Sequence, residues 1–398
     1  MSLVNETERE LKGSHNISEH GGLIDDQTLR IFLLVFTFVT LGLSLLGSAF
    51  NCINITVFLT LGAKDCVSVC LLSLAVSDFT CLFLGAVCGV CDILDAYGSA
   101  DFYVDPRGLY YQVIFISSMS YDISTYITAF ISLERCLCVA LPFRFKELFT
   151  FKRAVLAMAT IFCLTFCCYL PHYVTSGLRV QWDPRTNTTR VLLWSSKDMP
   201  AITAFLDLWN HLILAVTSVV IVIVCTHIMV TGLKKSSQFQ RRGAARPSEP
   251  DGPNNFKTSN EVGEGEENVL RDPDSRRDNN ISTPYCPTNV EKESSNKIKV
   301  EKSPQTLSAK NRRVVKMVST LAIVSILCNT SRLLFVVALR AEPDINFGHR
   351  YHNLYMVILV LAYIFQVINA PVNIFIYLKL NPSYRKTFSQ IFGIGQTK

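Results

Sequence analysis

Residues 131–142 read ISLERCLCVALP, and they close a long apolar segment with an acid and a base side by side, Glu134 and Arg135. Ionisable side chains in such a place are costly and usually serve a function. Apolar segments recur along the chain, and about 20 such residues are enough to cross a bilayer as a helix. They lie at 31–61, 66–93, 109–140, 153–175, 201–233, 314–339 and 353–378. We therefore predict an all-α integral membrane protein, a bundle of seven transmembrane helices.

Basic residues gather in alternate connections between these segments, and this pattern predicts how the chain crosses the membrane. The clusters lie within 144–153, 234–242, 312–316 and 385–386. An excess of Lys and Arg marks the cytoplasmic side. We therefore expect the N-terminus outside and the C-terminus inside, in a multi-pass protein of the plasma membrane. Sequons at Asn5, Asn16 and Asn187 then fall on the outer side, where we expect glycosylation.

The composition narrows the classes of function. The net charge of +6 lies mostly in the loops, so it favours contact with anionic lipid over binding of nucleic acid. The sequence holds no nucleophile–base pair, zinc-ligand spacing or phosphate-binding loop, so we expect neither an enzyme nor an organic cofactor. The 14 cysteines fall mostly in the apolar segments, where we expect them to pack as small apolar side chains.

The chain divides into regions of different composition. We predict an extracellular, glycosylated tail at 1–30, the first five helices within 31–233, a third cytoplasmic loop at 234–310, and the last two helices within 311–380. The loop is polar and rich in Gly and Pro, so it cannot offset the entropy cost of ordering and is predicted to be disordered. Within 381–398, aromatic residues recur at every fourth position, which predicts a short amphipathic helix at the membrane surface before the cytoplasmic tail.

Four motifs, in order along the chain, resemble those of the rhodopsin-like (class A) G-protein-coupled receptors. Asn51 matches the lone asparagine of that family's first helix, and LSLAVSD, ending at Asp78, resembles L-A-x-A-D. Glu134-Arg135-Cys136 resembles D-R-Y. NAPVNIFIY at 369–377 resembles N-S-x-x-N-P-x-x-Y. The resemblance covers all of the apolar segments and the short helix after them, and it implies a receptor that activates a heterotrimeric G protein.

The resemblance assigns a coupling role to residues at the inner end of the bundle. It implies that Glu134 holds Arg135 at rest and that the freed guanidinium contacts the G protein on activation. Pro142, Asn373 and Tyr377 belong to the same switch by their motifs.

The resemblance also implies an allosteric sodium ion in the middle of the bundle. Asp78 and Ser124 would hold the ion, within a network that includes Asn51, Asn369 and Asn373. Carboxylate and hydroxyl oxygens suit a hard cation. The alternative is a polar network that satisfies its own hydrogen bonds without an ion.

Several features depart from the family pattern and indicate a divergent member, similar to invertebrate neuropeptide and chemosensory receptors. Tyr110 stands where the family has a disulfide cysteine, and 174–200 contains no cysteine, so we expect no bridge there. Asn329 and Ser331 replace the tryptophan and proline of the sixth helix, and the fifth helix has no proline. Because kinks come mostly from proline, bends in these two helices are in doubt.

Polar residues in the outer halves of the helices are candidates for a ligand pocket. The positions that line the pocket of the family are Ser117, Tyr121, Asp122, Asn210, His211, Asn329, Arg332, Tyr363 and Gln366. Asp122 and Arg332 either pair with each other, or Arg332 receives a carboxylate or amide of the ligand. Ser117 stands where amine receptors carry aspartate, which argues against an amine ligand.

The acidic residues of the outer side favour a cationic peptide as the extracellular ligand. The alternatives are a small chemosensory molecule, a constitutively active receptor, and a membrane transporter or channel. Receptor kinases and arrestin are further expected partners, through serines of the third cytoplasmic loop.

Overall fold

The computed structural model describes residues 24–62, 65–98, 102–141, 149–184, 186–244, 309–342, 344–345 and 349–393. The predicted sites at Asn5, Asn16 and Pro142, and most of the predicted third cytoplasmic loop, lie outside these residues. The chain divides into one compact unit, residues 1–238 with 307–398, and a second unit, 239–306. Of the second unit, the structure describes only the end of one helix.

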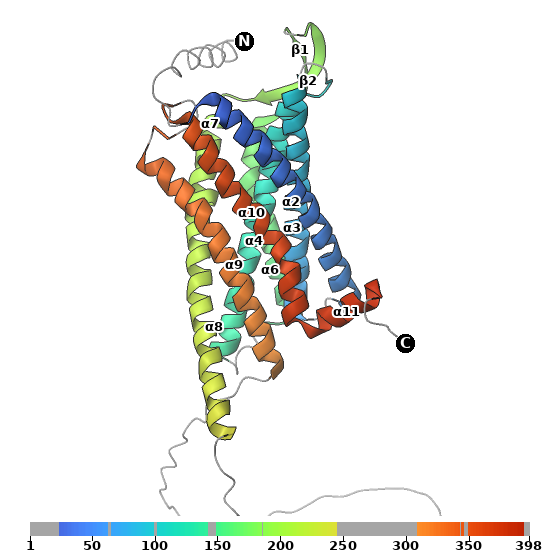
Figure 1. The fold of residues 1–398 in the computed structure, drawn as a ribbon, viewed down its shortest axis with the longest axis vertical. Coiled ribbons are helices and arrows are strands. Elements are labelled where there is room, and N and C mark those ends of the chain that lie inside the picture. Colours follow the sequence, from blue (N-terminus) through green and yellow to red (C-terminus); the bar gives the residue numbers. More distant parts are fainter. Residues whose placement is uncertain are drawn as a thin grey trace, which may run out of the picture. The chain divides into compact units, whose positions relative to one another are not determined.

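Seven helices in the described residues are long and apolar enough to cross a membrane, which confirms the predicted helical bundle. They are α2 (Asp26–Leu61), α3 (Cys66–Gly98), α4 (Pro106–Ala140), α6 (Phe151–Thr175), a fifth that runs through α7 (Met199–Leu206), η2 (Asp207–Leu214) and α8 (Ala215–Ala244), α9 (Ala309–Ala341) and α10 (His352–Leu380). α3 packs between α2 and α4, and α10 packs between α2 and α9 (Figure 1). The protein is therefore a multi-pass membrane protein.

The bundle has two distinct ends (Figure 1). One end carries a β-hairpin, β1 (Ser176–Asp183) paired antiparallel with β2 (Thr188–Ser195). The other end carries the short helix α11 (Pro382–Phe392), which follows α10 directly. We call these the hairpin end and the α11 end. The prediction assigned no strands to 176–195, and the structure adds this hairpin to the predicted helical bundle.

The hydrogen-bonding pattern of the fifth helix changes near the hairpin end, in a stretch that contains no proline. η2, at Asp207–Leu214, is a π-helix between two α-helical pieces. α9, whose sequence also lacks the family's proline, is one uninterrupted α-helix. π-helical turns often occur at functional sites, because the extra residue displaces the side chains around it.

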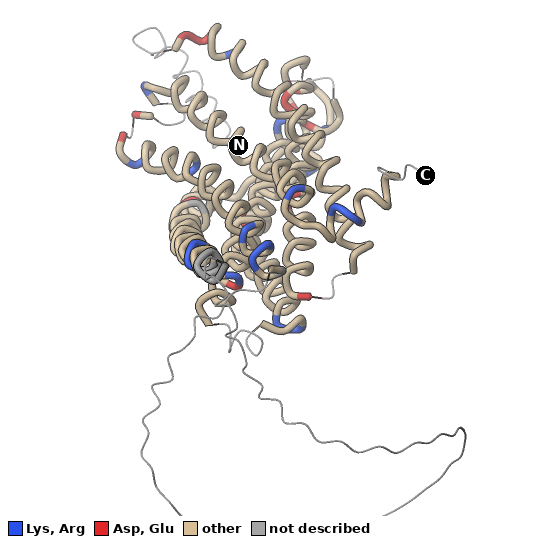
Figure 2. Tube along the Cα trace, turned by 60° about the horizontal axis from the view of Figure 1, so that its bottom comes forward, with Lys and Arg blue, Asp and Glu red and all other residues tan. Residues whose placement is uncertain are grey.

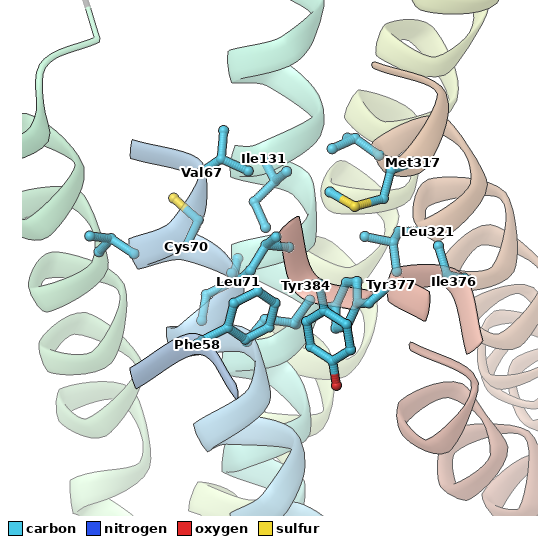
Figure 3. Packing of buried hydrophobic residues seen from close by; sticks show 14 of the residues in the cluster. Phe58, Val67, Cys70, Leu71, Ile131, Met317, Leu321, Ile376, Tyr377 and Tyr384 are labelled. Carbon is cyan, nitrogen blue, oxygen red and sulfur yellow. The ribbon is translucent and has the colours of Figure 1, made fainter. Parts of the chain in front are cut away.

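The largest cluster of buried apolar side chains in the described residues lies toward the α11 end and joins eight helices, α2, α3, α4, α6, α8, α9, α10 and α11. Phe58 of α2 contacts the rings of Tyr377 and Tyr384, with ring centroids 5.2 and 5.3 Å apart (Figure 3). Leu71 of α3 and Ile131 of α4 are buried in the same cluster. Many large apolar side chains on the outside of the helices are exposed, as a lipid-facing surface requires.

Gly47 allows α2 to approach α3 and α10 closely. A Cβ atom at this position would lie 2.6 Å from Leu82 Cδ1 and 2.7 Å from Pro371 Cγ. Pro371 lies inside α10, so its ring fills the space that a side chain at Gly47 would need. Gly42, about one turn earlier in the same helix, has nothing within 4 Å of such an atom.

These two glycines form a matched pair for a stability test. We expect Gly47→Ala to lower the free energy of unfolding by about 1–3 kcal/mol, because the new methyl overpacks the contact. Gly42→Ala should instead raise it by about 0.5–1 kcal/mol, since alanine is the better helix former. Thermal unfolding of the detergent-solubilised protein measures both. Equal changes in the two variants would contradict the close approach.

Candidate functional site

Glu134 and Arg135 form a buried ion pair in the last turns of α4, near the α11 end. Glu134 is fully buried, and Arg135 is 6% exposed. The guanidinium donates from Nε to Glu134 Oε2 at 2.7 Å and from Nη2 to Glu134 Oε1. A two-bond contact between guanidinium and carboxylate holds orientation as well as charge. The structure therefore shows the Glu134–Arg135 contact on which the expected coupling role depends.

Asp78 joins three helices in the middle of the bundle. It is 2% exposed on α3. Ser124 of α4 donates to Asp78 Oδ1 at 2.6 Å, and Asn373 of α10 donates to Asp78 Oδ2 at 2.8 Å. Asn369 lies one turn before Asn373 in α10 and is also buried, but within the described residues it donates no hydrogen bond to Asp78. Three of the five predicted network residues thus meet.

Asn51, the fourth member of that network, belongs to a different chain of contacts. Its amide donates to Gly47 O at 3.0 Å, and its Oδ1 accepts from Asn54 Nδ2 at 3.1 Å. Tyr384 of α11 donates to Asn54 Oδ1 at 2.7 Å and is completely buried. The sequence placed Tyr384 on the apolar face of a surface helix, whereas the structure uses it to fasten α11 to α2. Because the Tyr384 hydroxyl is buried, it needs a buried hydrogen-bond acceptor, and Asn54 provides one.

Asp122 lies at the centre of a second buried ionic group, nearer the hairpin end. Arg332 Nη1 donates to Asp122 Oδ1 at 2.8 Å, and Tyr169 Oη donates to Asp122 Oδ2 at 2.6 Å. Their exposed fractions are 2% for Asp122, 6% for Arg332 and 0% for Tyr169. Of the two alternatives for Asp122 and Arg332, the structure shows the pairing. We call Asp122, Tyr169 and Arg332 the Asp122 triad.

Tyr169 was missed by the sequence reasoning. It lies on α6, in an apolar segment where a tyrosine suggests nothing more than packing. The sequence signal that could have pointed to a further partner was Asp122 itself, because a buried carboxylate needs more than one hydrogen-bond donor.

Other predicted pocket residues also make hydrogen bonds within the bundle. Tyr121 Oη donates to Asn329 Oδ1 at 2.8 Å, and Asn329 donates to Ser325 O at 2.9 Å. Ser117 Oγ donates to Cys81 O at 2.9 Å, which joins α4 to α3. These three residues are buried, so in this conformation their polar atoms serve packing between helices.

Tyr363 and Gln366 of α10 differ from this group. Tyr363 packs against a buried cluster that contains Leu82 and Val367. Gln366 is partly buried. His211 lies in η2, and its side chain is outside the described residues.

Nine residues in the described part of the chain keep a buried side-chain polar atom without a protein partner, and Asn210 and Arg332 are the two among the predicted pocket residues. Both amide atoms of Asn210, which is 1% exposed on η2, lack a hydrogen bond. Arg332 Nη2 also lacks one. Buried polar atoms are nearly always paired, so these atoms of Asn210 and Arg332 are suited to a ligand or water.

The β-hairpin is fastened to the bundle without a disulfide. Asp105 N donates to Val191 O and Val191 N donates to Tyr103 O, both at 2.9 Å, which ties β2 to the segment before α4. Arg190 donates from Nε to Phe102 O at 2.7 Å and from Nη1 to Asp183 Oδ2 at 3.0 Å. All cysteines in the described residues are free. The Arg190 bond to Phe102 O and the backbone bonds therefore hold the loop at the place where the family uses a bridge, and the Arg190–Asp183 ion pair joins the two strands.

Arg190→Met should loosen this attachment. The substitution leaves the buried Asp183 carboxylate without its guanidinium, which we expect to lower the unfolding free energy of the hairpin end by about 1–3 kcal/mol. Hydrogen exchange of the 176–195 amides would report the change. Dithiothreitol should leave the same exchange unaltered, and strong acceleration by dithiothreitol would show that a disulfide holds the loop.

Comparison with known proteins agrees with this arrangement. The family described as "7 transmembrane receptor (rhodopsin family)" matches residues 51–372, which include Asp78 and Ser124, the Glu134–Arg135 pair and the Asp122 triad. No curated protein sequence matches the chain. The chain belongs to the rhodopsin family of seven-transmembrane receptors, the class A G-protein-coupled receptors.

Proposed function

We propose that the protein transmits binding of an extracellular ligand at the hairpin end to a heterotrimeric G protein at the α11 end. The observation that carries this proposal is the buried, two-bond contact between Glu134 and Arg135. Glu134 holds the Arg135 guanidinium inside the bundle. Release of this guanidinium would add a positive charge to the surface at the α11 end. A ligand that binds the open state better than the closed one shifts the population toward release.

The orientation in the membrane is part of the proposal. The α11 end carries mostly Lys and Arg (Figure 2), which supports a cytoplasmic location for that end. Asn187 lies at the opposite end, in the exposed turn of the hairpin, with φ of 55°. Asparagine tolerates this left-handed conformation well. An exposed sequon at the hairpin end supports glycosylation there and a plasma-membrane location.

We favour a cationic peptide as the ligand. Asp92, Asp95 and Asp207 place acidic groups toward the hairpin end, although Asp95 already pairs with Arg107 at 2.8 Å. The unpaired amide of Asn210 and Arg332 Nη2 suit carbonyl or carboxylate groups, which every peptide has. A small chemosensory molecule with a carboxylate is the second candidate, supported by the same unpaired atoms.

A ligand screen separates these candidates. Cells expressing the receptor with a promiscuous G protein are challenged with basic peptides, with acidic small molecules, and with buffer, and calcium is recorded. We expect a response to a subset of basic peptides. A response only to small molecules would favour the chemosensory role, and a full response in buffer would favour constitutive activity. Substrate flux into vesicles without any calcium response would favour a transporter and contradict the proposal.

We also propose that Asp78 and Ser124 hold a sodium ion in the resting state. Each carboxylate oxygen of Asp78 accepts one hydrogen bond, and a carboxylate has about four lone-pair sites, so capacity for a cation remains. The Ser124 hydroxyl oxygen is adjacent and can also face a cation. These residues fit a sodium ion, although the network also satisfies its hydrogen bonds alone.

The sodium proposal predicts a salt-specific effect on signalling. Replacing sodium chloride by choline chloride at equal ionic strength should raise basal nucleotide exchange about threefold to tenfold, which corresponds to a coupling of about 1 kcal/mol. Asp78→Asn should lose this dependence, and Asp95→Asn should keep it. Identical exchange in both salts with the unmodified protein would leave the self-satisfied network as the correct description.

Receptor kinases and arrestin remain proposed partners. Ser237 is a serine of the third cytoplasmic loop, and Arg312 Nη2 donates to its Oγ at 2.6 Å. A phosphate on Ser237 would strengthen its contact with a guanidinium.

A further inference from the structure

A basic hollow opens at the α11 end, where α9, α10 and α11 meet. Its volume is about 330 Å³, at the lower end of the range of about 300–1,000 Å³ that small ligands occupy. The lining residues are Arg313, Lys316, Lys379, Leu380, Pro382 and Arg385. We call this the basic hollow. It is separate from the Glu134–Arg135 pair, none of whose atoms line it.

The charge of the basic hollow has no counterpart among its lining residues. Four of the six lining side chains are cations and none is an acid. All four are exposed, and in the described part of the chain none of them forms an ion pair. Cations gathered in one concave surface repel one another and concentrate anions there. The arrangement therefore fits a ligand with several negative charges.

The start of α11 adds to this preference. The helix has 11 residues and begins at Pro382, in the wall of the hollow, with Asn381 as its N-cap. Asn381 accepts from Tyr384 N at 3.1 Å. The N-terminal end of a helix carries partial positive charge and attracts phosphate groups. This partial charge therefore attracts an anion to the same place as the side chains of Arg313, Lys316, Lys379 and Arg385.

The position of α11 indicates where the anion comes from. Phe388 and Phe392 pack on each other with ring centroids 4.8 Å apart, and Phe392 and Ile391 are exposed. A helix that combines exposed apolar residues with Arg385 and Lys386 lies at the membrane interface, with its apolar side among the acyl chains. The hollow at its first turn then lies at the depth of the lipid headgroups. Leu380 and Pro382 supply an apolar wall for the glycerol end of a lipid.

We propose that the basic hollow binds the phosphorylated inositol headgroup of a lipid in the adjacent leaflet. Basic pockets between helices on the cytoplasmic side are suited to such headgroups. Arg313 and Lys316 come from α9, whereas Lys379 and Arg385 come from α10 and α11. A headgroup that contacts both sets holds the ends of these helices together. The lipid thereby favours the conformation in which the hollow is formed.

The test uses the full-length receptor in nanodiscs of phosphatidylcholine that contain a small fraction of phosphatidylinositol bisphosphate. Bound lipid is counted by native mass spectrometry, so the measurement does not require G-protein coupling. The test variant is Lys379→Gln with Arg385→Gln. The matched control is Lys152→Gln with Lys386→Gln, which removes the same charge from exposed residues outside the hollow.

We expect lipid affinity to fall at least about tenfold in the test variant, because charge-assisted contacts to phosphate are lost. The control should change it less than about twofold. Both variants should unfold at the temperature of the unmodified protein in phosphatidylcholine alone, and Arg313→Gln with Lys316→Gln repeats the test if one of them does not.

Three outcomes would overturn the proposal. Equal binding of phosphatidylserine at matched total charge would show general attraction to anionic lipid. Equal affinity for free inositol trisphosphate, with no gain from the acyl chains, would assign the hollow to a soluble phosphate. Displacement of the lipid by a phosphopeptide that binds more tightly would assign it to a protein partner. Loss of G-protein activation with lipid binding intact would count against the proposed function and not against this site.

Discussion

Arg135→Gln is expected to abolish ligand-stimulated nucleotide exchange on the G protein, lowering the rate by more than tenfold. The guanidinium is one of the few charges buried in the bundle, and it is held by two charge-assisted bonds to Glu134. Glutamine fills similar space but carries no charge to present to a partner, so release of the residue no longer changes the surface. Exchange is measured with purified receptor and G protein in nanodiscs, with ligand binding recorded on the same sample.

Glu134→Gln should act in the opposite direction. Losing one charge-assisted contact weakens the restraint on Arg135 by about 1.5 kcal/mol, which raises exchange without ligand about tenfold. Two neighbouring substitutions of similar size then give opposite signs, which a general loss of stability cannot produce. If exchange survives in Arg135→Gln on every G protein tested, the proposed coupling role is wrong.

Asp122→Asn should be the most destabilising single substitution discussed here, lowering the unfolding free energy by about 3–5 kcal/mol. It leaves the Arg332 guanidinium buried without a counter-charge, and Arg332 Nη2 already lacks a partner. Tyr169 also loses its charged acceptor. Arg332→Met should cost a similar amount, because it leaves the Asp122 carboxylate buried. Thermal unfolding in detergent gives both values.

The decisive control removes the whole Asp122 triad. Asp122→Leu, Tyr169→Phe and Arg332→Met together replace every polar atom of the group with apolar side chains of similar volume. Buried ion pairs exchanged for apolar residues are often neutral or stabilising, so the triple variant should be more stable than either single one. Additive losses, with the triple variant the least stable, would refute the mutual pairing. Full stability of Asp122→Asn with a large loss of ligand potency would assign the pair to the ligand.

The predicted number of helices was correct because the signal for each is local. A segment such as 109–140 is long and apolar enough by itself to cross a bilayer, whatever it packs against. The motifs around Asp78 and Arg135 were equally accessible, because charges in apolar segments stand out in the sequence. The predicted start of α11 was also close, because its aromatic period and Asn381-Pro382 mark a helix beginning.

Local sequence patterns could not identify hydrogen-bond partners that come from distant segments of the chain. Tyr169 and Arg332 meet Asp122 from two other helices, and Tyr384 meets Asn54 across more than three hundred residues. The sequence suggested one joint network for Asn51 and Asp78, whereas helix packing separated their contacts. The strands of the hairpin were missed because their pairing and their attachment through Arg190 depend on where α4 begins.

The sequence by itself determined that this chain is a seven-helix membrane receptor of the rhodopsin family, with an arginine at one end of its third transmembrane helix and a carboxylate in the middle of its second. Only the tertiary structure decided which groups satisfy the buried charges, how the hairpin is held without a disulfide, and which four cations share the basic hollow. The physical reason is that apolar length and local charge are properties of single segments. Hydrogen-bond partners and concave surfaces arise only from the rotation and close approach of several helices at once.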